Sequence, residues 1–364
     1  MKIIKVNLKK RSYKIIVGSG ILKRLSREIR ALKLGTDAFI ITNKLIRTKF
    51  GKALESSLRA SGITARFRII PDTEKSKSVE TASAVIKDLA GFDKARRVFI
   101  ISFGGGVVGD LGGFVASIYK RGVPYIQIPT TLLAQVDSAI GGKTAIDLSA
   151  GKNLVGAFYQ PRLVFSDTNF LQTLSSRQLK TGLAEVIKYG IIKDKELFSF
   201  LAKNYKSVLK KRQTYLEFIV ERCSKIKADI VSKDEREERG FRTILNFGHT
   251  LGHAIETAGR YNSYNHGEAV AIGMLVAGDI SVALGLTDSK TLGRIEKVIK
   301  ETGLPITIEK IDSGNIISAH YKDKKFTGKR NRFVLCAGIG KVKVVDNIPF
   351  AIIKEALRNR INGP

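Results

Sequence analysis

In the first half of the chain, short apolar runs alternate with segments of helical periodicity. Apolar or alternating runs predict strands at residues 2–8, 13–17, 37–42, 64–70, 97–103 and 125–128. Apolar positions three and four apart predict helices at residues 43–61 and 78–89, and a third that follows a glycine-rich stretch and ends at residue 120. This alternation is typical of a parallel sheet covered by helices, so we expect an α/β domain over residues 1–168.

After residue 168 the pattern becomes almost entirely helical. Helical spacing predicts helices at residues 175–193, 215–231, 243–259, 268–284, 292–302 and 351–360. One late strand pair, at residues 332–335 and 342–345, interrupts this series. We therefore expect residues 169–364 to form a second, helical domain.

The composition narrows the class of protein. A chain of 364 residues is long enough for about two domains. Its two cysteines exclude a disulfide framework and a zinc site made only of cysteines. The first twelve residues lack the apolar core of a signal peptide, and no run approaches the roughly 20 apolar residues of a membrane helix. These features predict a soluble cytoplasmic protein without a membrane partner.

The net charge is unusually positive. Lysine and arginine number 63 against 33 acidic residues, a formal charge of +30. Such an excess invites a nucleic-acid interpretation, but the basic residues are spread along the whole chain without an interleaved aromatic binding module. We therefore expect no nucleic-acid partner, and a general attraction for anions that includes phosphorylated substrates.

A glycine-rich loop is the first candidate for chemistry. Gly104, Gly106 and Gly109 fit the pattern G-x-G-x-x-G between a predicted strand and a predicted helix. Glycines allow the backbone to approach a pyrophosphate, and the helix N-terminus offers free N–H groups to it. A tight strand-to-helix turn would need the same glycines. The next strand ends without an acidic residue for a ribose, although Asp110 follows the loop directly.

Histidines form the second candidate. The chain has four, and His249, His253 and His266 fall within eighteen residues. His249 and His253 lie four apart, on one face of a predicted helix. Neutral imidazole suits zinc, and Glu185, among apolar neighbours, is the best candidate for a further ligand. The spacing leaves open whether His253 is a ligand or a proton carrier.

Basic and amide residues also occur in apolar or glycine-rich settings, although each of them, taken singly, fits a solvated side chain better than a ligand. They are Lys143, Lys152, Asn153, Lys188, Arg242 and Asn246. Together with a metal and a nucleotide loop, they indicate an anionic, polyhydroxylated substrate.

Several long segments resemble the 3-dehydroquinate synthase family. They are residues 104–161, GLAEVIKYG at 182–190, LNFGHTLGHAIE at 245–256 and HGEAVAIGM at 266–274. The resemblance implies a Rossmann-like α/β domain and a helical domain with the active site in the cleft between them. It further implies conversion of 3-deoxy-D-arabino-heptulosonate 7-phosphate to 3-dehydroquinate and phosphate, a step of the shikimate pathway, with catalytic NAD, Zn²⁺ or Co²⁺, and a homodimer.

The resemblance also implies a role for individual residues. The metal ligands would be Glu185, His249 and His266, which makes His253 a polar group in proton transfer. The substrate contacts would be Asp137, Lys143, Asn153, Lys188, Lys227, Arg242, Asn246 and His253. The phosphate contacts would be Arg121, reaching from the partner subunit of a dimer, and Lys324 or Lys325. The NAD contacts would be Asn43, Glu74, Lys77, Gly105, Gly106, Val107, Asp110, Thr130, Thr131, Leu133, Lys143, Lys152 and Thr168.

Two related activities remain as alternatives. A sister cyclase, of the 2-deoxy-scyllo-inosose or epi-valiolone synthase type, would use a sugar phosphate that has no carboxylate. A metal-dependent polyol dehydrogenase would release NADH. Arg242, Asn246 and Lys227 favour a substrate with a carboxylate, because a guanidinium binds that group through two parallel hydrogen bonds.

Overall fold

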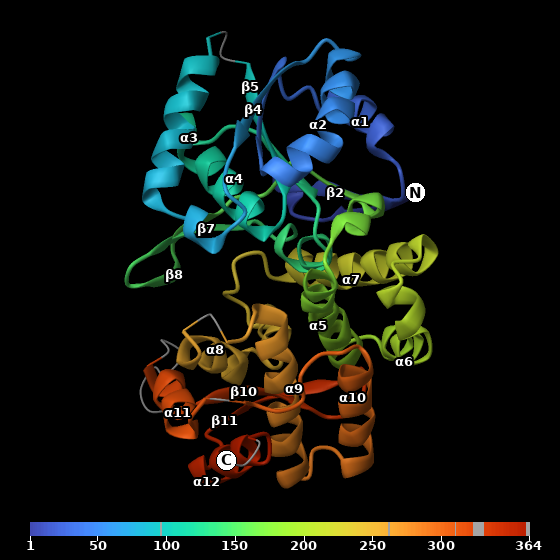
Figure 1. Cartoon of the computed structure of the whole chain (residues 1–364), viewed down its shortest axis with the longest axis vertical. Coiled ribbons are helices and arrows are strands. Elements are labelled where there is room, and N and C mark those ends of the chain that lie inside the picture. The colour runs from blue at the N-terminus through green and yellow to red at the C-terminus, as the bar shows by residue number, and fades with distance from the viewer. Residues whose placement is uncertain (95–96, 261–262, 310, 323–330, 362–364) are drawn as a thin grey trace. The chain divides into compact units, whose positions relative to one another are not determined.

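The computed structural model describes residues 1–94, 97–260, 263–309, 311–322 and 331–361 (Figure 1). The chain divides into two compact units, Met1–Leu174 with Leu216–Arg236, and Ser175–Tyr215 with Glu237–Pro364. The sequence analysis expected one boundary, at residue 168. The chain instead leaves the first unit after Leu174 and returns to it, because most of helix α7 (Gln213–Lys233) belongs to the first unit.

A seven-stranded sheet forms the centre of the first unit. Its strands are β1 (Lys2–Val6), β2 (Tyr13–Gly18), β3 (Asp37–Thr42), β4 (Thr64–Ile69), β5 (Val98–Gly104), β6 (Tyr125–Pro129) and β9 (Leu163–Asp167). Their order is β1-β2-β9-β6-β5-β3-β4, and every neighbouring pair except β1 and β2 is parallel. Strand β5 is buried along its whole length, as a parallel strand covered on both faces must be. The predicted α/β fold is confirmed.

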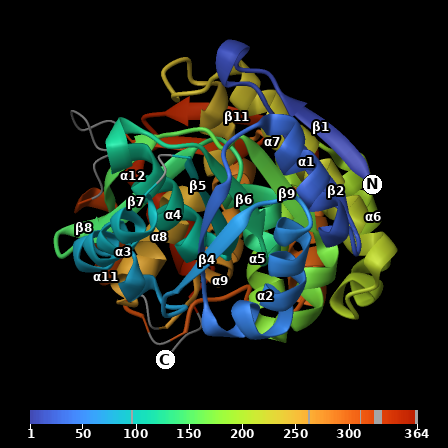
Figure 2. The ribbon, with the colours of Figure 1, turned by 90° about the horizontal axis from the view of Figure 1, so that it is seen from above.

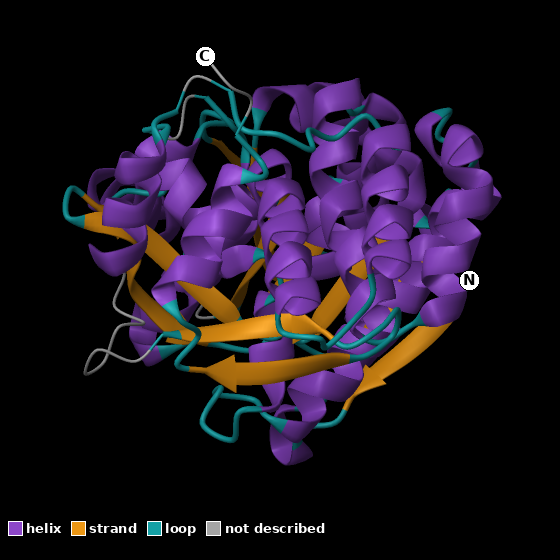
Figure 3. Cartoon of the chain, turned by 90° about the horizontal axis from the view of Figure 1, so that it is seen from below, coloured by secondary structure: helices purple, strands orange, loops and turns teal. Residues whose placement is uncertain are grey.

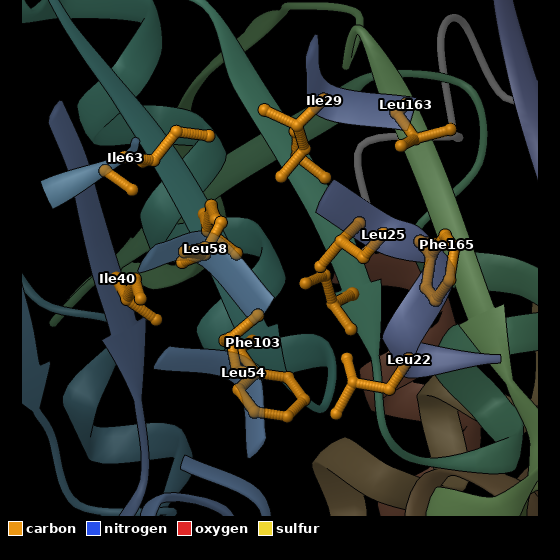
Figure 4. Close-up of a cluster of buried hydrophobic side chains, with 14 of the residues drawn as sticks. Leu22, Leu25, Ile29, Ile40, Leu54, Leu58, Ile63, Phe103, Leu163 and Phe165 are labelled. Atoms are coloured by element: carbon orange, nitrogen blue, oxygen red, sulfur yellow. The ribbon is translucent and has the colours of Figure 1, made fainter. Parts of the chain in front are cut away.

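Helices cover both faces of this sheet. They are α1 (Leu25–Leu32) and α2 (Lys44–Arg59) on one face, and α3 (Val79–Phe92) and α4 (Gly106–Ile118) on the other (Figure 2). Leu54, Leu58 and Leu25 from the first pair pack on Ile40, Phe103 and Phe165 of the strands (Figure 4). Since these side chains are almost completely buried, their burial fixes both helices against the sheet.

Glycines bring α4 unusually close to its neighbours, at Gly112 to the sheet and at Gly113 to a residue outside it. A Cβ atom added at Gly112 would lie 2.1 Å from Ser102 Oγ, and one at Gly113 would lie 2.4 Å from Thr144 Cγ2. A side chain at either position would therefore require the neighbouring residue or the helix to shift. This close packing fixes the N-terminus of α4, where the glycine loop lies.

The segment between β6 and β9 contains elements that the sequence analysis did not predict. A π-helical turn, Ala134–Ser138, precedes a hairpin of β7 (Lys143–Leu148) and β8 (Gly151–Phe158). Leu154, Val155 and Phe158 of β8 are 40%, 37% and 41% exposed. Strand β8 therefore presents apolar side chains to solvent.

The second unit consists mainly of helices (Figure 3). They are α5 (Ser176–Ile192), α6 (Lys195–Leu209), α8 (His249–Ala258), α9 (His266–Ala283), α10 (Ser289–Glu301), α11 (Ser313–Lys322) and α12 (Phe350–Arg358). Strands β10 (Arg332–Cys336) and β11 (Val342–Asp346) pair as predicted. Among the described residues, α9 alone is long and apolar enough to cross a membrane, but 72% of it is buried inside the protein, as in a core helix.

One predicted helix is wrong in its extent. Residues 243–259 form two segments, the 3₁₀ helix Phe241–Asn246 and helix α8. They are separated at Gly248, whose φ of +77° is a left-handed conformation that glycine adopts without strain. The apolar periodicity runs through this break, so it could not reveal it. His249 is consequently the first residue of a helix rather than an interior one.

Candidate active site

A buried carboxylate in the second unit is surrounded by two histidines. Glu185 lies on α5 and is completely buried. Its Oε1 atom is 3.4 Å from His249 Nε2 and 3.5 Å from His266 Nε2. A tetrahedral ion with bonds of about 2.1 Å separates its ligands by about 3.4 Å. Both distances from the carboxylate thus match those around one zinc-like ion, and all three donor atoms lie within 4.8 Å of one another.

The state of the carboxylate supports a cation at this place. Within the described part of the chain, neither oxygen of Glu185 accepts a hydrogen bond, although Lys188 Nζ forms an ion pair with Oε2. Burial alone would raise the pKa of Glu185, but Lys188 and His249 outweigh it and hold this pKa well below its usual value. An ionised, buried carboxylate with free lone pairs is costly unless a cation binds it. One carboxylate and two imidazoles suit zinc or a similar divalent ion.

Both histidines lie at the N-terminus of a helix. His249 begins α8 and His266 begins α9, where Asn265 and Glu268 form a capping box. A Cβ atom added at Gly273 of α9 would lie 2.0 Å from the carbonyl oxygen of Gly248, so the two helices meet backbone to backbone. A Cβ atom at Gly267 would lie 2.4 Å from the carbonyl oxygen of Thr181 on α5. Glycines therefore set the spacing of all three helices that carry the donor atoms.

Each histidine also has a partner for its second ring nitrogen. His249 Nδ1 lies 3.2 Å from the carbonyl oxygen of Phe247, and His266 Nδ1 lies 3.3 Å from Glu256 Oε2. Burial lowers the pKa of His249. Burial would also lower the pKa of His266, but Glu185 and Glu256 raise it to about 10.

The sequence analysis left the role of His253 open. Its ring centre is 5.4 Å from that of His249 and 6.2 Å from that of His266, so all three rings form one group. His253, Glu256 and His266 are a second set of donors close enough to hold an ion. The two sets share His266 but use opposite nitrogens of its ring.

Other predicted residues of the second unit lie nearby in sequence. Lys188 is 2% exposed and lies one helical turn from Glu185. Arg242 is also 2% exposed, and its Nε atom is 3.2 Å from Glu237 Oε1. Glu237 was not predicted, because it stands in the charge run DEREER, which is typical of a solvated surface. Asn246 is the last residue of the 3₁₀ helix that Arg242 belongs to.

In the first unit, the glycine loop joins β5 to α4. Gly105 is the N-cap residue of α4 and Gly106 its first residue, so Val107 and Gly106 lie in the first turn. A Cβ atom at Gly106 would lie 3.4 Å from Ser138 Oγ and 4.0 Å from Ser138 Cβ, which is ordinary van der Waals contact. Thr130 and Thr131 follow the neighbouring strand β6, and Thr131 lies against Gly105. This strand–loop–helix arrangement is the one that binds phosphate groups in nucleotide sites.

Four predicted residues meet beside this loop. The ammonium group of Lys77 donates to Asp110 Oδ2 at 2.9 Å and to Asn153 Oδ1 at 2.5 Å, and lies 3.4 Å from Glu74 Oε1. Burial would lower the pKa of Lys77, but Asp110 and Glu74 raise it above its usual value. Lys77 is therefore a positive charge held among acceptors.

A second pair in the first unit joins Asp137 and Lys227. Lys227 Nζ lies 2.7 Å from Asp137 Oδ1 and 2.7 Å from the carbonyl oxygen of the same residue. Lys143, at the start of β7, is exposed, and Lys152 is half-buried at the start of β8.

The remaining predicted residues are more scattered. Asn43 caps α2 by accepting from the N–H of Ile46 at 2.9 Å, and Thr168 donates to the carbonyl oxygen of Gly18 at 3.2 Å. Leu133 precedes the π-helical turn. Arg121 lies beyond the C-terminal end of α4, away from the glycine loop. Lys324 and Lys325 lie outside the described residues.

Known proteins of similar sequence share one name. Desulforamulus reducens has a 3-dehydroquinate synthase that is 45% identical over 98% of this chain and 99% of its own length. The 3-dehydroquinate synthase of Thermodesulfovibrio yellowstonii is 44% identical over the full length of both.

Solved structures show the same fold. The 2-epi-5-epi-valiolone synthase ValA of Streptomyces hygroscopicus, with NAD⁺ and Zn²⁺ bound, has a TM-score of 0.88 and 27% identity over 97% of both chains. A 2-deoxy-scyllo-inosose synthase, in complex with carbaglucose-6-phosphate, NAD⁺ and Co²⁺, has a TM-score of 0.87 and 25% identity over 99% of this chain and 100% of its own.

Family comparison agrees with these relatives. Residues 67–181 match the family described as 3-dehydroquinate synthase N-terminal, and residues 182–326 match the family described as 3-dehydroquinate synthase C-terminal. The matched regions contain Lys77, the glycine loop, Glu185 and both histidines. With these matches and the full-length identity to its relatives, the chain belongs to the 3-dehydroquinate synthase family.

Proposed function

We propose that this chain converts 3-deoxy-D-arabino-heptulosonate 7-phosphate to 3-dehydroquinate and inorganic phosphate, as a carbon–oxygen lyase of the shikimate pathway. The observation that carries the proposal is the buried Glu185 with its two histidines, in a chain that is 45% identical to a 3-dehydroquinate synthase over nearly its whole length.

NAD and Zn²⁺ or Co²⁺ are the proposed cofactors. The related cyclases named above bind NAD⁺ with one of these ions. Glu185, His249 and His266 would hold the ion. When bound, NAD supplies an acceptor for a hydride that is returned in the same turnover, and the metal supplies a Lewis acid for a substrate hydroxyl.

The NAD site would be built on the first unit. Gly105, Gly106 and Val107 would offer N–H groups to the pyrophosphate. The other proposed contacts are Asn43, Glu74, Lys77, Asp110, Thr130, Thr131, Leu133, Lys143, Lys152 and Thr168. Because Lys77 is already held by Asp110 and Glu74, its charge would be in place before the nucleotide arrives.

The substrate has two anionic ends, and the proposed contacts supply cations for both. Arg242 would bind the carboxylate, and Asn246 and Lys227 would be further substrate contacts. Lys143, Lys188 and Asn153 would position the hydroxyl groups, and Asp137 would orient Lys227 through their ion pair. Lys324 or Lys325 would bind the phosphate.

The chain's own residues would act mainly by orientation and charge. Lys188 forms an ion pair with Glu185 beside the proposed metal site, so the positive charge of Lys188 would stabilise an alkoxide that forms on a nearby substrate hydroxyl. His253 adjoins both ligand histidines and would hold or pass a proton of that hydroxyl. The leaving phosphate can take the proton released in the elimination, so no separate carboxylate base is assigned.

We also propose that the enzyme is a cytoplasmic homodimer. Both cysteines are free and buried, as is usual in a reducing compartment. Arg121 follows α4, whose 13 residues span about 20 Å, so a second copy is a better source of this side chain at the phosphate. The exposed apolar side chains of β8 would be covered by that copy, because an uncovered apolar edge strand invites association.

The test is release of inorganic phosphate from the heptulosonate phosphate. With catalytic amounts of NAD and with zinc present, we expect many turnovers per NAD. Glucose 6-phosphate and sedoheptulose 7-phosphate are the matched controls, since both lack the carboxylate. Turnover of either control in preference to the heptulosonate would assign the chain to a sister cyclase. Accumulation of stoichiometric NADH from a polyol would indicate a dehydrogenase instead.

A further inference from the structure

The ring of His266 is contacted on both sides. Its Nε2 atom lies 3.5 Å from Glu185 Oε1, and its Nδ1 atom lies 3.3 Å from Glu256 Oε2. An imidazole that gives the lone pair of Nε2 to a metal carries its proton on Nδ1, and that N–H needs an acceptor when it is buried. We infer that Glu256 is this acceptor, a positioning residue that fixes the tautomer and orientation of His266. The inference rests on the metal site of the proposed function.

The spacing along α8 supports this role. His249, His253 and Glu256 stand at positions i, i+4 and i+7, which share one face of a helix. Glu256 is therefore on the same face as His249, and it reaches the ring of His266 from the side opposite to Glu185. Its side chain is 9% exposed, so water competes little for its oxygens.

The two histidines are held by different kinds of acceptor. The Nδ1 atom of His249 faces the carbonyl oxygen of Phe247, a neutral group. The Nδ1 atom of His266 faces a carboxylate. A carboxylate on the far side of an imidazole makes the metal-facing nitrogen a stronger donor, and loss of such a partner typically weakens metal binding about 10- to 100-fold.

A competing assignment uses the same atoms. His253, Glu256 and His266 could themselves hold an ion, with Nδ1 of His266 as the donor. Glu185 argues against this, because Lys188 pairs with Oε2, whereas the buried Oε1 accepts no hydrogen bond in the described part of the chain and would lack a metal ion. A neutral imidazole has a free lone pair on only one of its two nitrogens, so His266 cannot bind a metal in both sets at once.

The experiment titrates zinc and cobalt(II) into the metal-free enzyme without NAD or substrate. The variants are Glu256→Gln, which keeps an oxygen acceptor and removes the charge, and Glu256→Ala, which removes both. We expect zinc affinity to fall about tenfold in the first and up to about 100-fold in the second. The cobalt spectrum should keep its intensity in both variants, because the coordinating atoms are unchanged. Glu268→Gln is the matched control, since Glu268 caps α9, the helix that His266 begins, by accepting from the N–H of Asn265; its affinity should be unaltered.

Each other outcome contradicts the inference in a distinct way. Wild-type affinity in both Glu256 variants would show that Glu256 does not position His266. Loss of the cobalt spectrum in Glu256→Gln and also in His253→Ala would make the competing set the metal centre. A wild-type protein that binds neither ion would refute the metal assignment of the proposed function, and this inference with it. If Glu256→Ala fails to fold, the nearly isosteric Glu256→Gln decides.

Discussion

Lys77 in the first unit and Glu185 in the second are both buried charged groups, but their surroundings differ. The ammonium group of Lys77 is surrounded by the carboxylates of Asp110 and Glu74 and by the amide oxygen of Asn153. Glu185 has a single ammonium group, from Lys188, and two imidazoles. No hydrogen bond to its oxygens is present among the described residues. The ammonium group of Lys77 thus has its acceptors in place, whereas Oε1 of Glu185 still has room for a cation besides Lys188, which pairs with Oε2.

This difference teaches what each region contributes. A cluster that satisfies itself keeps its geometry without a ligand, so the nucleotide region is preorganised. A bound cation stabilises a buried carboxylate whose oxygen accepts no hydrogen bond from the protein. Substitutions in the nucleotide region should therefore weaken nucleotide binding and leave the fold intact. Substitutions of the residues around Glu185 should abolish metal binding.

The largest effect is expected at the metal ligands. His249→Ala and His266→Ala each remove one of three donors, so both should lose bound zinc and nearly all activity. His253→Ala should keep the ion and slow turnover. Metal content measured by atomic spectroscopy after gel filtration, together with phosphate release, checks this. An empty site in His253→Ala with a filled one in His249→Ala would reverse the ligand assignment.

Arg242 is the next test. Its replacement by alanine removes the proposed partner of the substrate carboxylate, and we expect kcat/KM to fall about a hundredfold. Arg242→Lys should be intermediate, because an ammonium group cannot form two parallel hydrogen bonds. Steady-state phosphate release measures both variants, with zinc content and NAD binding as controls that should not change. Near-normal efficiency in Arg242→Ala would place the carboxylate on other residues.

A side chain at Gly106 should separate ligand binding from folding. Gly106→Val places methyl groups where the backbone would approach the pyrophosphate, so we expect NAD affinity to fall about tenfold or more. The fold should be kept, since Ser138 Oγ is the nearest atom to a Cβ there, at 3.4 Å. Gly112→Ala is the contrasting control, with a Cβ 2.1 Å from Ser102 Oγ, and should lower the melting temperature instead. Calorimetric titration and thermal unfolding measure the pair.

The smallest effect is a dependence on pH. The pKa of about 10 means that His266 holds a proton at neutral pH without metal, and the ion must displace it. Apparent zinc affinity should therefore rise with pH, by at most about tenfold per unit, until pH 10 is approached. Lys77, with its raised pKa, stays charged over the same range, so NAD affinity should stay flat. Zinc affinity that is equally flat between pH 6 and 9 would contradict the protonated state of His266.

Much of this fold could be predicted from the sequence because its signals are local. The buried strands of the first unit are continuous apolar runs, and the helices around them have clear periodicity. Helix α6 and the hairpin of β7 and β8 were not predicted. Strand β8 has no buried residue, so burial imposes no alternation on it, although β7 buries Thr144 and Ile146. The return of α7 to the first unit depends on contacts between distant segments, which no local pattern encodes.

The candidate site divides in the same way. The scarce histidines and Glu185 were identifiable from their types and settings, and the structure does bring them together. Glu237 and Glu256 were missed because acidic residues on helices and in charge runs are common, so only their contacts with Arg242 and His266 distinguish them. That His249 is the first residue of α8 depends on the left-handed conformation of Gly248, which the periodicity does not reveal.

Gly267 and Gly273 of α9 give the metal centre a hidden dependence on residues that have no donor atoms. Each allows a neighbouring helix to approach within backbone contact, so the distance between ligands is set by the absence of a methyl group. An alanine at either position would leave Glu185, His249 and His266 unaltered and still move one of them. Inspection of the donor residues alone would find such a variant unchanged, although the distances between its donor atoms would no longer suit a metal ion.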